Sequence, residues 1–217
     1  MSARTYAADG IEVRYDPRRC IHFEACVRGL PRVFDPNRRP WIDPAQAAPA
    51  AVAEVVTRCP PGALHFTRTD GGPGEAVPTA NAVTVAPDGP LYVRGDVRVE
   101  VPGGEVVLRD TRVALCRCGR SKNQPFCDNS HRGSFTDPAR LGTHGATAPE
   151  GEGPLRVVLE TDGPLLLRGP VTICGTDGAE TSTAKAALCR CGHSSNKPFC
   201  DGTHREVGFR SGAPPGA

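Results

Sequence analysis

Aromatic residues are scarce in this chain, and long apolar runs are absent from it. Only 11 of the 217 residues are Trp, Tyr or Phe, so we expect a modest hydrophobic core. Small, loop-rich modules of this kind often need a bound metal to stabilise them. A membrane-spanning helix needs about 20 consecutive apolar residues, and the sequence contains no run of that length.

The chain also lacks a strong charge of either sign. Its 26 Lys and Arg residues nearly balance its 24 Asp and Glu residues, for a net charge of +2, which argues against a general nucleic-acid binder. No basic region followed by an apolar segment begins the sequence, so no secretory signal is visible. Nine of the ten cysteines stand in groups with ligand spacings and therefore indicate metal ligation in a reducing compartment rather than disulfides. We expect a cytoplasmic protein.

One segment of the sequence occurs twice. Residues 116–131 and 189–204 are identical at 11 of 16 positions, at an offset of 73 residues. Each copy has three cysteines and one histidine at the same places, a combination that typically holds a metal. Thiolate and imidazole favour zinc or an iron–sulfur cluster over magnesium or calcium.

The spacing within each copy bears on the choice between zinc and iron–sulfur. Structural zinc sites usually have about two to four residues between paired cysteines, whereas a single residue separates Cys116 from Cys118. Cys127 and His131 stand at i and i+4, so one helical turn would direct both at the same metal. This pattern predicts two ligand pairs on two irons, one Cys/Cys and one Cys/His. A zinc-stabilised interaction scaffold is the alternative, and it would be colourless.

The second copy fully matches, and the first nearly matches, the pattern C-x-C-x2-S-x3-P-x-C-D-G-S/T/A-H, which resembles the signature of the CDGSH (NEET) iron–sulfur family. In that family three cysteines and one histidine hold a [2Fe–2S] cluster. The first copy departs from the pattern at Asn129, where the family has Gly. Asn is the non-glycine residue that best tolerates left-handed backbone, so we expect the turn to form. The resemblance implies Cys116, Cys118, Cys127 and His131 as ligands of one cluster, and Cys189, Cys191, Cys200 and His204 as ligands of the other.

Further residues of the two motifs are expected to support the ligands. Asp128 and Asp201 each follow a ligand cysteine and are expected to cap the turn. Ser121 and Ser194 are expected to hydrogen-bond near the clusters and tune their potentials. Basic residues around the motifs would either offset the charge of anionic clusters or form a docking surface for an acidic redox partner. These basic residues are Arg117, Arg120, Lys122 and Arg132 in the first copy, and Arg190, Lys197 and Arg205 in the second.

Three further cysteines lie in the N-terminal part. Cys20 and Cys26 are spaced C-x5-C, and Cys59 precedes a proline, a dipeptide that supplies the remote ligand in ferredoxins. The segment resembles small single-cluster ferredoxins, and also the divergent mono-cluster 4Fe–4S domain that is joined to CDGSH modules in bacteria. Phe23 stands where a regular ferredoxin has its second cysteine. The resemblance therefore implies a [3Fe–4S] cluster, or a [4Fe–4S] cluster with a non-cysteine fourth ligand, for which His22 is the nearest candidate.

Hydrophobic periodicity and turn residues predict the main elements. The N-terminal part is expected to contain a helix over residues 45–58 and strands over residues 11–16 and 63–67. Each copy of the motif is preceded by short strands, so the repeat is a whole module rather than a ligand loop alone. These strands are predicted over residues 82–85, 91–101 and 105–110 in the first module, and over 155–160 and 165–168 in the second.

Segments rich in Gly and Pro divide the chain. We expect a ferredoxin-like domain over residues 1–70, a linker over 71–81, a CDGSH module over 82–141, a linker over 142–153 and a second module over 154–217. The fold class is α+β, with a ferredoxin-like domain followed by two small β-rich modules. A strand-rich module tends to pair its exposed edge strand with that of a copy, and an isolated module of this size is only marginally stable. As the family resemblance also implies, we expect an intramolecular pseudo-dimer rather than two independent modules.

These observations predict an electron-transfer protein with three clusters, and not an enzyme, because no general base, nucleophile or substrate-binding glycine loop is evident. The alternative is a redox- or pH-sensitive sensor, or a donor of [2Fe–2S] clusters to apo-proteins. The expected partner is a reductase or oxidoreductase, and the expected state is a monomer with an internal pseudo-two-fold axis. Acid competes with metal for imidazole, and imidazole in place of thiolate raises a cluster's potential. Changing His204 to Cys should therefore lower that potential and slow cluster loss in acid.

Overall fold

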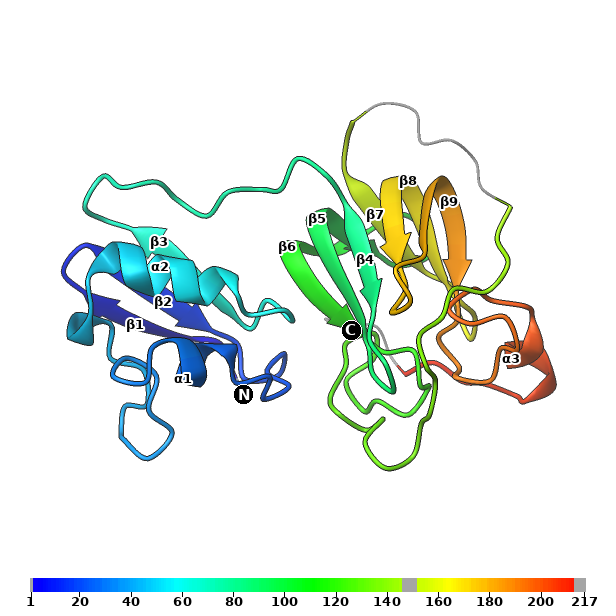
Figure 1. The fold of residues 1–217 in the computed structure, drawn as a ribbon, viewed down its shortest axis with the longest axis horizontal. Helices are drawn as coiled ribbons and strands as arrows, with labels where there is room; N and C mark the ends of the chain where they lie inside the picture. Colours follow the sequence, from blue (N-terminus) through cyan, green and yellow to red (C-terminus); the bar gives the residue numbers. More distant parts are fainter. Residues whose placement is uncertain (1, 146–151, 213–217) are drawn as a thin grey trace. The chain divides into compact units, whose positions relative to one another are not determined.

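The computed structural model describes residues 2–145 and 152–212, so the middle of the predicted linker over residues 142–153 lies outside the described residues. The chain divides into two compact units, Met1–Ala76 and Val77–Ala217, which we call the first and second units (Figure 1). Within the described ranges, every helix is too short or too polar to span a bilayer. Most of the regular structure is β-strand, with few and short helices.

The first unit is built on a three-stranded antiparallel sheet in the order β1-β2-β3. Strands β2 and β3 match the two predicted strands, whereas β1 has no counterpart among the predictions. The predicted helix over residues 45–58 is divided in two, because Pro49 lacks an N–H and suits the first position of a new helix. The elements are β1 (Arg4–Ala8), β2 (Ile11–Tyr15), α1 (Ala25–Gly29), a 3-10 turn (Pro44–Gln46), α2 (Pro49–Thr57) and β3 (Leu64–Arg68).

Helix α2 provides much of the core of the first unit. Val52, Val55 and Val56 are buried on one face of this helix, at the spacing that places side chains on the same side of a helix. The β2 residues Ile11 and Val13 belong to the same buried cluster, and their alternation is the period-2 pattern of a strand with one buried face. Cys59 belongs to this cluster too, so the core directly supports one of the predicted ligands.

The described part of the second unit contains six strands and one short helix. All five strands predicted for this region are present, and β6 and β8 are longer than predicted. Strand β8 continues past a shift in register between Arg168 and Val171. The elements are β4 (Ala82–Val85), β5 (Leu91–Glu100), β6 (Val106–Leu115), β7 (Leu155–Leu159), β8 (Leu165–Cys174), β9 (Glu180–Leu188) and α3 (Thr203–Glu206).

The two modules exchange strand pairings. Strand β4 pairs antiparallel with β5 of its own module and parallel with β8 of the other module. In the same way, β7 pairs antiparallel with β8 and parallel with β5. The first strand of each module therefore lies between its own second strand and that of the other module, so both modules contribute to one continuous hydrogen-bonded network.

Strands β5 and β8 change partner at a bend that only glycine accommodates. The register of β5 shifts between Arg94 and Val97, and Gly95 at this point has φ +149°. A Cβ atom on Gly95 would lie 2.1 Å from Oδ1 of Asn81. The same Asn81 oxygen accepts a 3.0 Å hydrogen bond from the Asp96 N–H, so the bend is held by a buried side chain.

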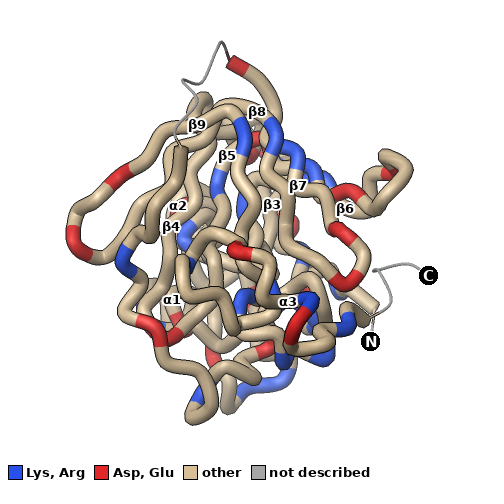
Figure 2. Tube along the Cα trace, turned by 90° about the vertical axis from the view of Figure 1, so that its right-hand side faces the viewer, with Lys and Arg blue, Asp and Glu red and all other residues tan. Residues whose placement is uncertain are grey.

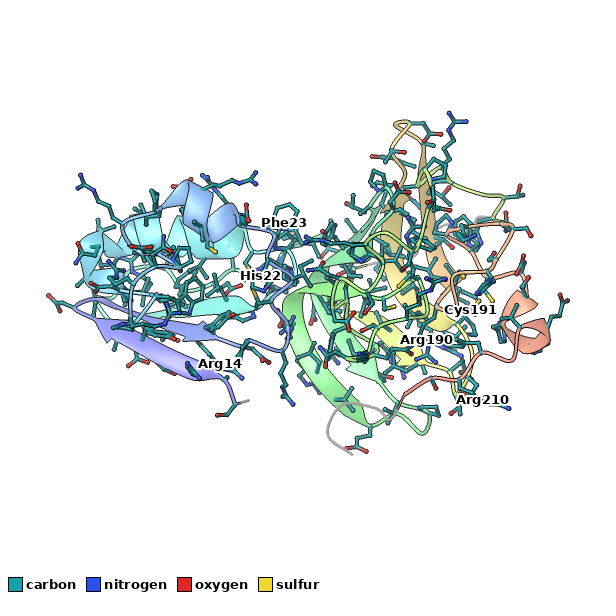
Figure 3. The ribbon with its side chains drawn as sticks, turned by 90° about the horizontal axis from the view of Figure 1, so that it is seen from below. Arg14, His22, Phe23, Arg190, Cys191 and Arg210 are labelled. Atoms are coloured by element: carbon teal, nitrogen blue, oxygen red, sulfur yellow. The ribbon has the colours of Figure 1, made fainter. Side chains whose placement is uncertain are left out.

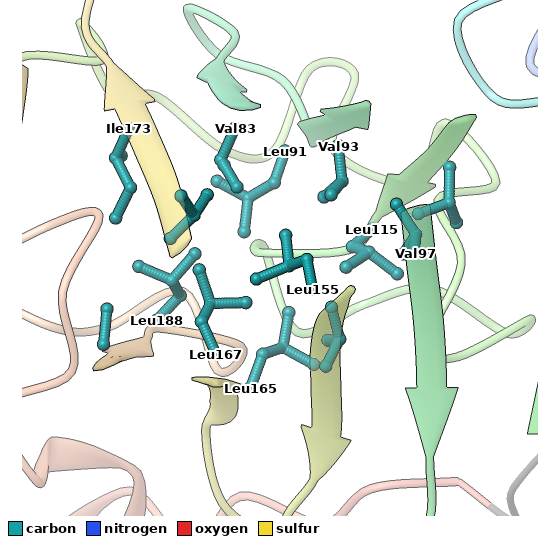
Figure 4. Packing of buried hydrophobic residues seen from close by; sticks show 14 of the residues in the cluster. Val83, Leu91, Val93, Val97, Leu115, Leu155, Leu165, Leu167, Ile173 and Leu188 are labelled. Atoms are coloured by element: carbon teal, nitrogen blue, oxygen red, sulfur yellow. The ribbon is translucent and has the colours of Figure 1, made fainter. Parts of the chain in front are cut away.

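A single hydrophobic cluster fills the interior of the second unit (Figure 4). Leu91 and Leu115 from the first module and Leu155, Leu165 and Leu188 from the second are fully buried in it. Because apolar burial is the main stabilising term in folding, each module covers part of the other's apolar surface. Neither module has a separate core among the described residues.

Candidate metal centres

Each repeated motif forms the loop that follows the last strand of its module. Strand β6 ends at Leu115, directly before Cys116, and the chain then returns to the end of this strand. The N–H of Cys127 donates to the Ala114 carbonyl at 2.9 Å, and the N–H of Cys116 donates to the Pro125 carbonyl at 2.8 Å. These bonds place the third cysteine of the motif beside the first.

The second copy makes the same pair of bonds after β9. The N–H of Cys200 donates to the Ala187 carbonyl at 2.8 Å, and the N–H of Cys189 donates to the Pro198 carbonyl at 2.8 Å. The two ligand loops therefore share one construction, in which a strand end positions the third cysteine through backbone hydrogen bonds.

The donor atoms of the first loop lie in two close pairs. The Sγ atoms of Cys116 and Cys118 are 3.6 Å apart, because residues i and i+2 of an extended chain share a face. Cys127 Sγ lies 3.4 Å from Nδ1 of His131. Asn129 has φ +72°, so the left-handed turn expected at this position forms.

The second loop repeats this arrangement. The Sγ atoms of Cys189 and Cys191 are 3.7 Å apart, and Cys200 Sγ lies 3.3 Å from Nδ1 of His204. Across the described residues, no group of three or more His, Cys, Asp or Glu side chains is placed to hold a single metal ion. In each loop the four donors lie instead as two close pairs, one Cys/Cys and one Cys/His.

Burial and hydrogen bonding set the protonation of these donors. Burial raises the pKa of Cys127 and that of Cys191, each to about 11. The pKa of Cys116 is instead lowered to about 6, first by a hydrogen bond from the Cys118 thiol and then by nearby backbone N–H groups, including that of Ser121. Burial lowers the pKa of His131, which favours the neutral imidazole that binds metal.

Asp128 and Asp201 hold the two ends of each ligand loop together. Asp201 accepts hydrogen bonds from the N–H of Thr203 at 3.1 Å, at the start of α3, and from the N–H of Ser195 at 2.7 Å. Asp128 accepts from the N–H of Ser130 at 3.0 Å and from that of Lys122 at 2.8 Å. The first bond of each pair closes a short turn two residues long and is not the expected helix cap, because the N-cap residue of α3 is Gly202 and makes no side-chain cap bond. The second bond fastens the segment between the second and third cysteines.

Ser121 and Ser194 brace the same segment from inside. The Ser121 hydroxyl donates to the Phe126 carbonyl at 2.6 Å and accepts from the Asn123 N–H at 3.0 Å. The Ser194 hydroxyl donates to the Phe199 carbonyl at 2.6 Å. Both hydroxyls thus bond to loop backbone, and Ser121 acts on the Cys116 sulfur through its N–H.

The two ligand loops contact each other directly. A Cβ atom on Gly119 would lie 2.4 Å from the carbonyl oxygen of Cys191, and one on Gly192 would lie 2.7 Å from that of Cys118. Both glycines also have positive φ, +78° and +86°. Each loop therefore needs glycine at this position for the backbone of the other loop to approach.

Two residues of the predicted basic surface are not on the surface. Arg117 and Arg190 have exposed fractions of 1% and 3%, so the prediction is wrong for both. Their position between paired cysteines at a strand end turns the side chains inward, where they bond to backbone carbonyls. The exposed basic residues of the motifs are Arg120, Lys122, Arg132 and Arg205. Elsewhere along the trace, basic and acidic residues are interspersed (Figure 2).

In the first unit, the three predicted ligand cysteines line one cavity of about 700 Å³. Cys20 follows β2, Cys26 lies in α1, and Cys59 follows α2. Burial raises the pKa of Cys26 to about 11, with further increases from the thiolates of Cys59 and Cys20, so the three thiols lie near one another. His22 also lines this cavity.

The loop before α1 carries unusual backbone. His22 has φ +52° and Glu24 has φ +66°, and Phe23 between them is 50% exposed. Figure 3 labels His22 and Phe23 next to each other in this loop. Both His22 and Phe23, which stands where a regular ferredoxin has its second cysteine, line the cavity and are exposed.

Tyr15 is a residue of this cavity that the sequence analysis did not single out. Burial raises the pKa of Tyr15, as do the charge of Cys20 and a hydrogen bond with it. The Tyr15 ring packs edge-on against Trp41 with centroids 4.9 Å apart. Its place at the end of β2, shortly before the C-x5-C segment, was the only sequence feature that could have indicated this role.

The donor set fits iron–sulfur chemistry. Thiols and imidazoles form both the loops and the cavity, and soft donors of this kind suit iron–sulfur clusters or zinc rather than magnesium or calcium. The donors of both loops lie as close Cys/Cys and Cys/His pairs. The ligands named from the sequence stay predictions for the loops and for the cavity.

Comparisons with known proteins agree with this chemistry. A family model described as "Divergent 4Fe-4S mono-cluster" matches residues 6–69, and one described as "Iron-binding zinc finger CDGSH type" matches residues 88–132 and 162–205. The uncharacterized protein YjdI of Escherichia coli (strain K12) is 38% identical over 63 residues, which are 29% of this chain and 83% of that protein. YjdI of Escherichia coli O157:H7 gives the same values. The chain therefore belongs to the CDGSH iron–sulfur family, as a tandem member with an N-terminal divergent 4Fe–4S mono-cluster domain.

Proposed function

We propose that this protein transfers single electrons through three iron–sulfur clusters, two of them [2Fe–2S] clusters in the second unit. The observation that carries the proposal is the repeated pairing of donors, with S–S distances of 3.6 and 3.7 Å and S–N distances of 3.4 and 3.3 Å. This pairing supports Cys/Cys ligation of one iron and Cys/His ligation of the other in each loop. A bound cluster supplies one-electron redox chemistry.

The residues of the loops would hold the clusters and adjust their potentials. Backbone N–H groups bond to the sulfurs of Cys116, Cys127 and Cys191, and such bonds stabilise negative charge on sulfur. Mostly buried sulfurs limit solvent access, a further determinant of potential. The rigid connection of each loop to a strand end keeps donor positions similar in both redox states.

For the first unit we propose a [3Fe–4S] cluster, or a [4Fe–4S] cluster with His22 as its fourth ligand. Three cysteines and His22 line the same cavity, which supports either form. His22 is exposed, so it can move toward or away from a fourth iron at little cost in packing. The number of irons in this cluster is therefore the measurement that decides between the two forms.

The test is iron and sulfide analysis combined with EPR under anaerobic conditions. The intact protein is compared with protein cut in the linker over residues 71–81, near the boundary between the units at Ala76. We expect two [2Fe–2S] signals from the C-terminal fragment, a three- or four-iron signal from the N-terminal fragment, and reversible reduction of all three. Zinc without sulfide would contradict the proposal.

A second candidate function is sensing or cluster donation. Cys200 and His204 border an open cavity of about 700 Å³, and access of this kind would let protons or an acceptor protein reach the Cys/His side of the site. Quantitative transfer of iron and sulfide to an apo-ferredoxin would favour this function. Retention of the clusters through repeated redox cycles would favour electron transfer.

We further propose that the two modules act as one intramolecular pseudo-dimer, so that the chain works as a monomer and not as an enzyme. The reciprocal pairings of β4 with β8 and of β7 with β5 support this arrangement. The exposed basic residues near the motifs, Arg120, Lys122, Arg132 and Arg205, support docking of an acidic reductase or oxidoreductase. All ten cysteines are free thiols, which supports a reducing compartment such as the cytoplasm.

A further inference from the structure

Arg117 and Arg190 occupy the same place in the two modules. Each lies between the first two cysteines of its motif and is almost fully buried. Nε of Arg117 donates to the Gly89 carbonyl at 2.8 Å, and Nε of Arg190 donates to the Gly163 carbonyl at 3.0 Å. In each case Nη2 donates to the carbonyl three residues earlier. Two of the three guanidinium nitrogens are thus satisfied identically.

An aromatic ring follows each motif at the corresponding position. The guanidinium of Arg117 lies 4.9 Å from the ring centroid of Phe135, and that of Arg190 lies 5.5 Å from the ring centroid of Phe209. Two residues after each phenylalanine, a backbone N–H donates to the Asp of a D-G-P turn, from Asp137 to Asp88 at 2.6 Å and from Ser211 to Asp162 at 2.7 Å. Asp137 and Ser211 are therefore equivalent positions.

The third guanidinium nitrogen, Nη1, has different surroundings in the two modules. Nη1 of Arg117 donates to Oδ1 of Asp137 at 2.6 Å, forming a buried ion pair. Ser211 has no charge, and its hydroxyl bonds to Asp162 at 3.2 Å. Among the described residues, Nη1 of Arg190 has no hydrogen-bond partner, and no carboxylate lies within ion-pair distance of its guanidinium.

Arg190 lines a cavity of about 390 Å³ in the second unit, together with Ser211, Arg210, Asp162 and Pro125. Figure 3 shows Arg190, Cys191 and Arg210 in the same region of this unit. The Asp162 carboxylate is already occupied, since it accepts from the Ser211 N–H and from Arg210 at 2.9 Å. Two guanidinium groups against one carboxylate leave this cavity with an excess of positive charge.

We propose that this cavity binds a small carboxylate anion against Arg190, in the place that the Asp137 side chain occupies against Arg117. A buried charge is costly unless it is paired, and the planar guanidinium matches the geometry of a carboxylate. In the first module, the equivalent arginine, Arg117, is paired with a carboxylate, that of Asp137. In the second module Arg190 faces a cavity instead of a carboxylate side chain.

Occupancy would also act on the neighbouring ligand loop, a consequence that rests on the proposed function. Arg190 stands between Cys189 and Cys191, two predicted ligands of the second loop. Pairing Arg190 with an anion removes its net positive charge. Adding an electron at this loop then becomes less favourable, and the potential of the cluster there falls.

The test is equilibrium dialysis of the cluster-loaded protein against labelled acetate, with chloride as competitor at constant ionic strength. We expect the wild type to bind one acetate per chain in preference to chloride. Ser211→Asp places a carboxylate on the chain itself and should abolish binding, whereas Ser211→Ala leaves the cavity open and should bind as the wild type does. Equal competition by chloride, or acetate binding that persists in Ser211→Asp, would overturn the proposal.

Potentiometric titration of the same samples separates this proposal from the proposed function. Acetate should lower the potential of one [2Fe–2S] signal in the wild type and in Ser211→Ala, and leave Ser211→Asp unchanged. Bound acetate with unchanged potentials would overturn the electrostatic consequence alone. Protein that lacks clusters or reversible potentials would overturn the proposed function, and acetate binding would still be measured by dialysis.

Discussion

The two units assemble their candidate sites in opposite ways. In the second unit, the four donors of each site lie within 16 consecutive residues, and one strand end brings them together through backbone hydrogen bonds. In the first unit, Cys20 follows β2, Cys26 lies in α1 and Cys59 follows α2, and the three meet only around a cavity. A local donor set is positioned by its own loop, whereas a dispersed set depends on the packing of a whole domain.

This difference has a consequence for stability. The first-unit cavity is held by α2 and the sheet, whose apolar residues pack with Cys59, so loss of a cluster there should loosen the entire unit. In the second unit, none of the predicted ligand cysteines belongs to the hydrophobic cluster of both modules. Loss of one cluster there should leave the sheet folded.

Removal of one ligand from each kind of site should give the largest effect. Cys59→Ala is expected to abolish the N-terminal cluster and destabilise the first unit, since it also removes a core side chain. Cys200→Ala is expected to abolish one [2Fe–2S] cluster and leave the N-terminal cluster intact. Iron and sulfide content, EPR and circular dichroism measure these outcomes. If either variant lost every cluster, the sites of the two units would not be independent of each other.

The contact between the ligand loops can be broken at Gly119. Gly119→Ala would place Cβ 2.4 Å from the Cys191 carbonyl oxygen, at a cost of about 1–3 kcal/mol for overpacking added to about 1–2 kcal/mol for left-handed backbone. Gly133→Ala is the matched control, because Gly133 has φ +70° with nothing within 4 Å of its Cβ position. Urea unfolding of the two variants should show a larger loss for Gly119→Ala. Equal losses would mean that the loops do not constrain each other.

Replacement of each histidine donor by cysteine compares the two sites of the second unit with each other. His131→Cys and His204→Cys are each expected to lower the potential of the altered site by roughly 100 mV, because thiolate adds negative charge that imidazole lacks. Protonation of imidazole releases metal as pH falls, so both variants should also lose their clusters more slowly in acid. Redox titration and the rate of bleaching at low pH test this. Unchanged values in both assays would refute the ligand assignment.

The smallest expected effect concerns the dispersed site. Tyr15→Phe removes the hydroxyl that bonds to Cys20 and keeps the ring against Trp41. A hydrogen bond worth about 1 kcal/mol corresponds to a decrease of roughly 40 mV in potential for one electron. Tyr6→Phe is the control, since Tyr6 lines the same cavity. A comparable change in both variants would exclude a specific role for Tyr15.

Strand positions followed from local pattern, whereas strand partners did not. The alternation around Leu91 and Leu165 predicted strands that the structure contains. The parallel pairings of β4 with β8 and of β7 with β5 leave no trace in that alternation. Such pairings depend on which apolar faces bury each other, and this is decided by the packing of residues far apart in the chain.

Arg190 illustrates the same limit at the level of one residue. Its charge and its place between two cysteines predicted a surface position, yet it is buried against Gly163 and Phe209. The D-G-P turn and the phenylalanine that surround it are distant in sequence. Only the folded structure, which brings both of them to the end of β9, shows that the guanidinium bonds to backbone carbonyls. It also shows that the uncharged Ser211 stands where the first module has Asp137.

The sequence by itself determined the donor types and their spacing in the repeated loops, because residues within one turn or one extended dipeptide are neighbours in any fold. It also determined Asn129 and Gly202 at the left-handed position of each loop, because the backbone imposes that choice locally. Only the tertiary structure decided which loops touch, which arginine has a carboxylate, and that Tyr15 bonds to Cys20. Those contacts join segments distant in the chain, and the burial of apolar surface brings such segments together.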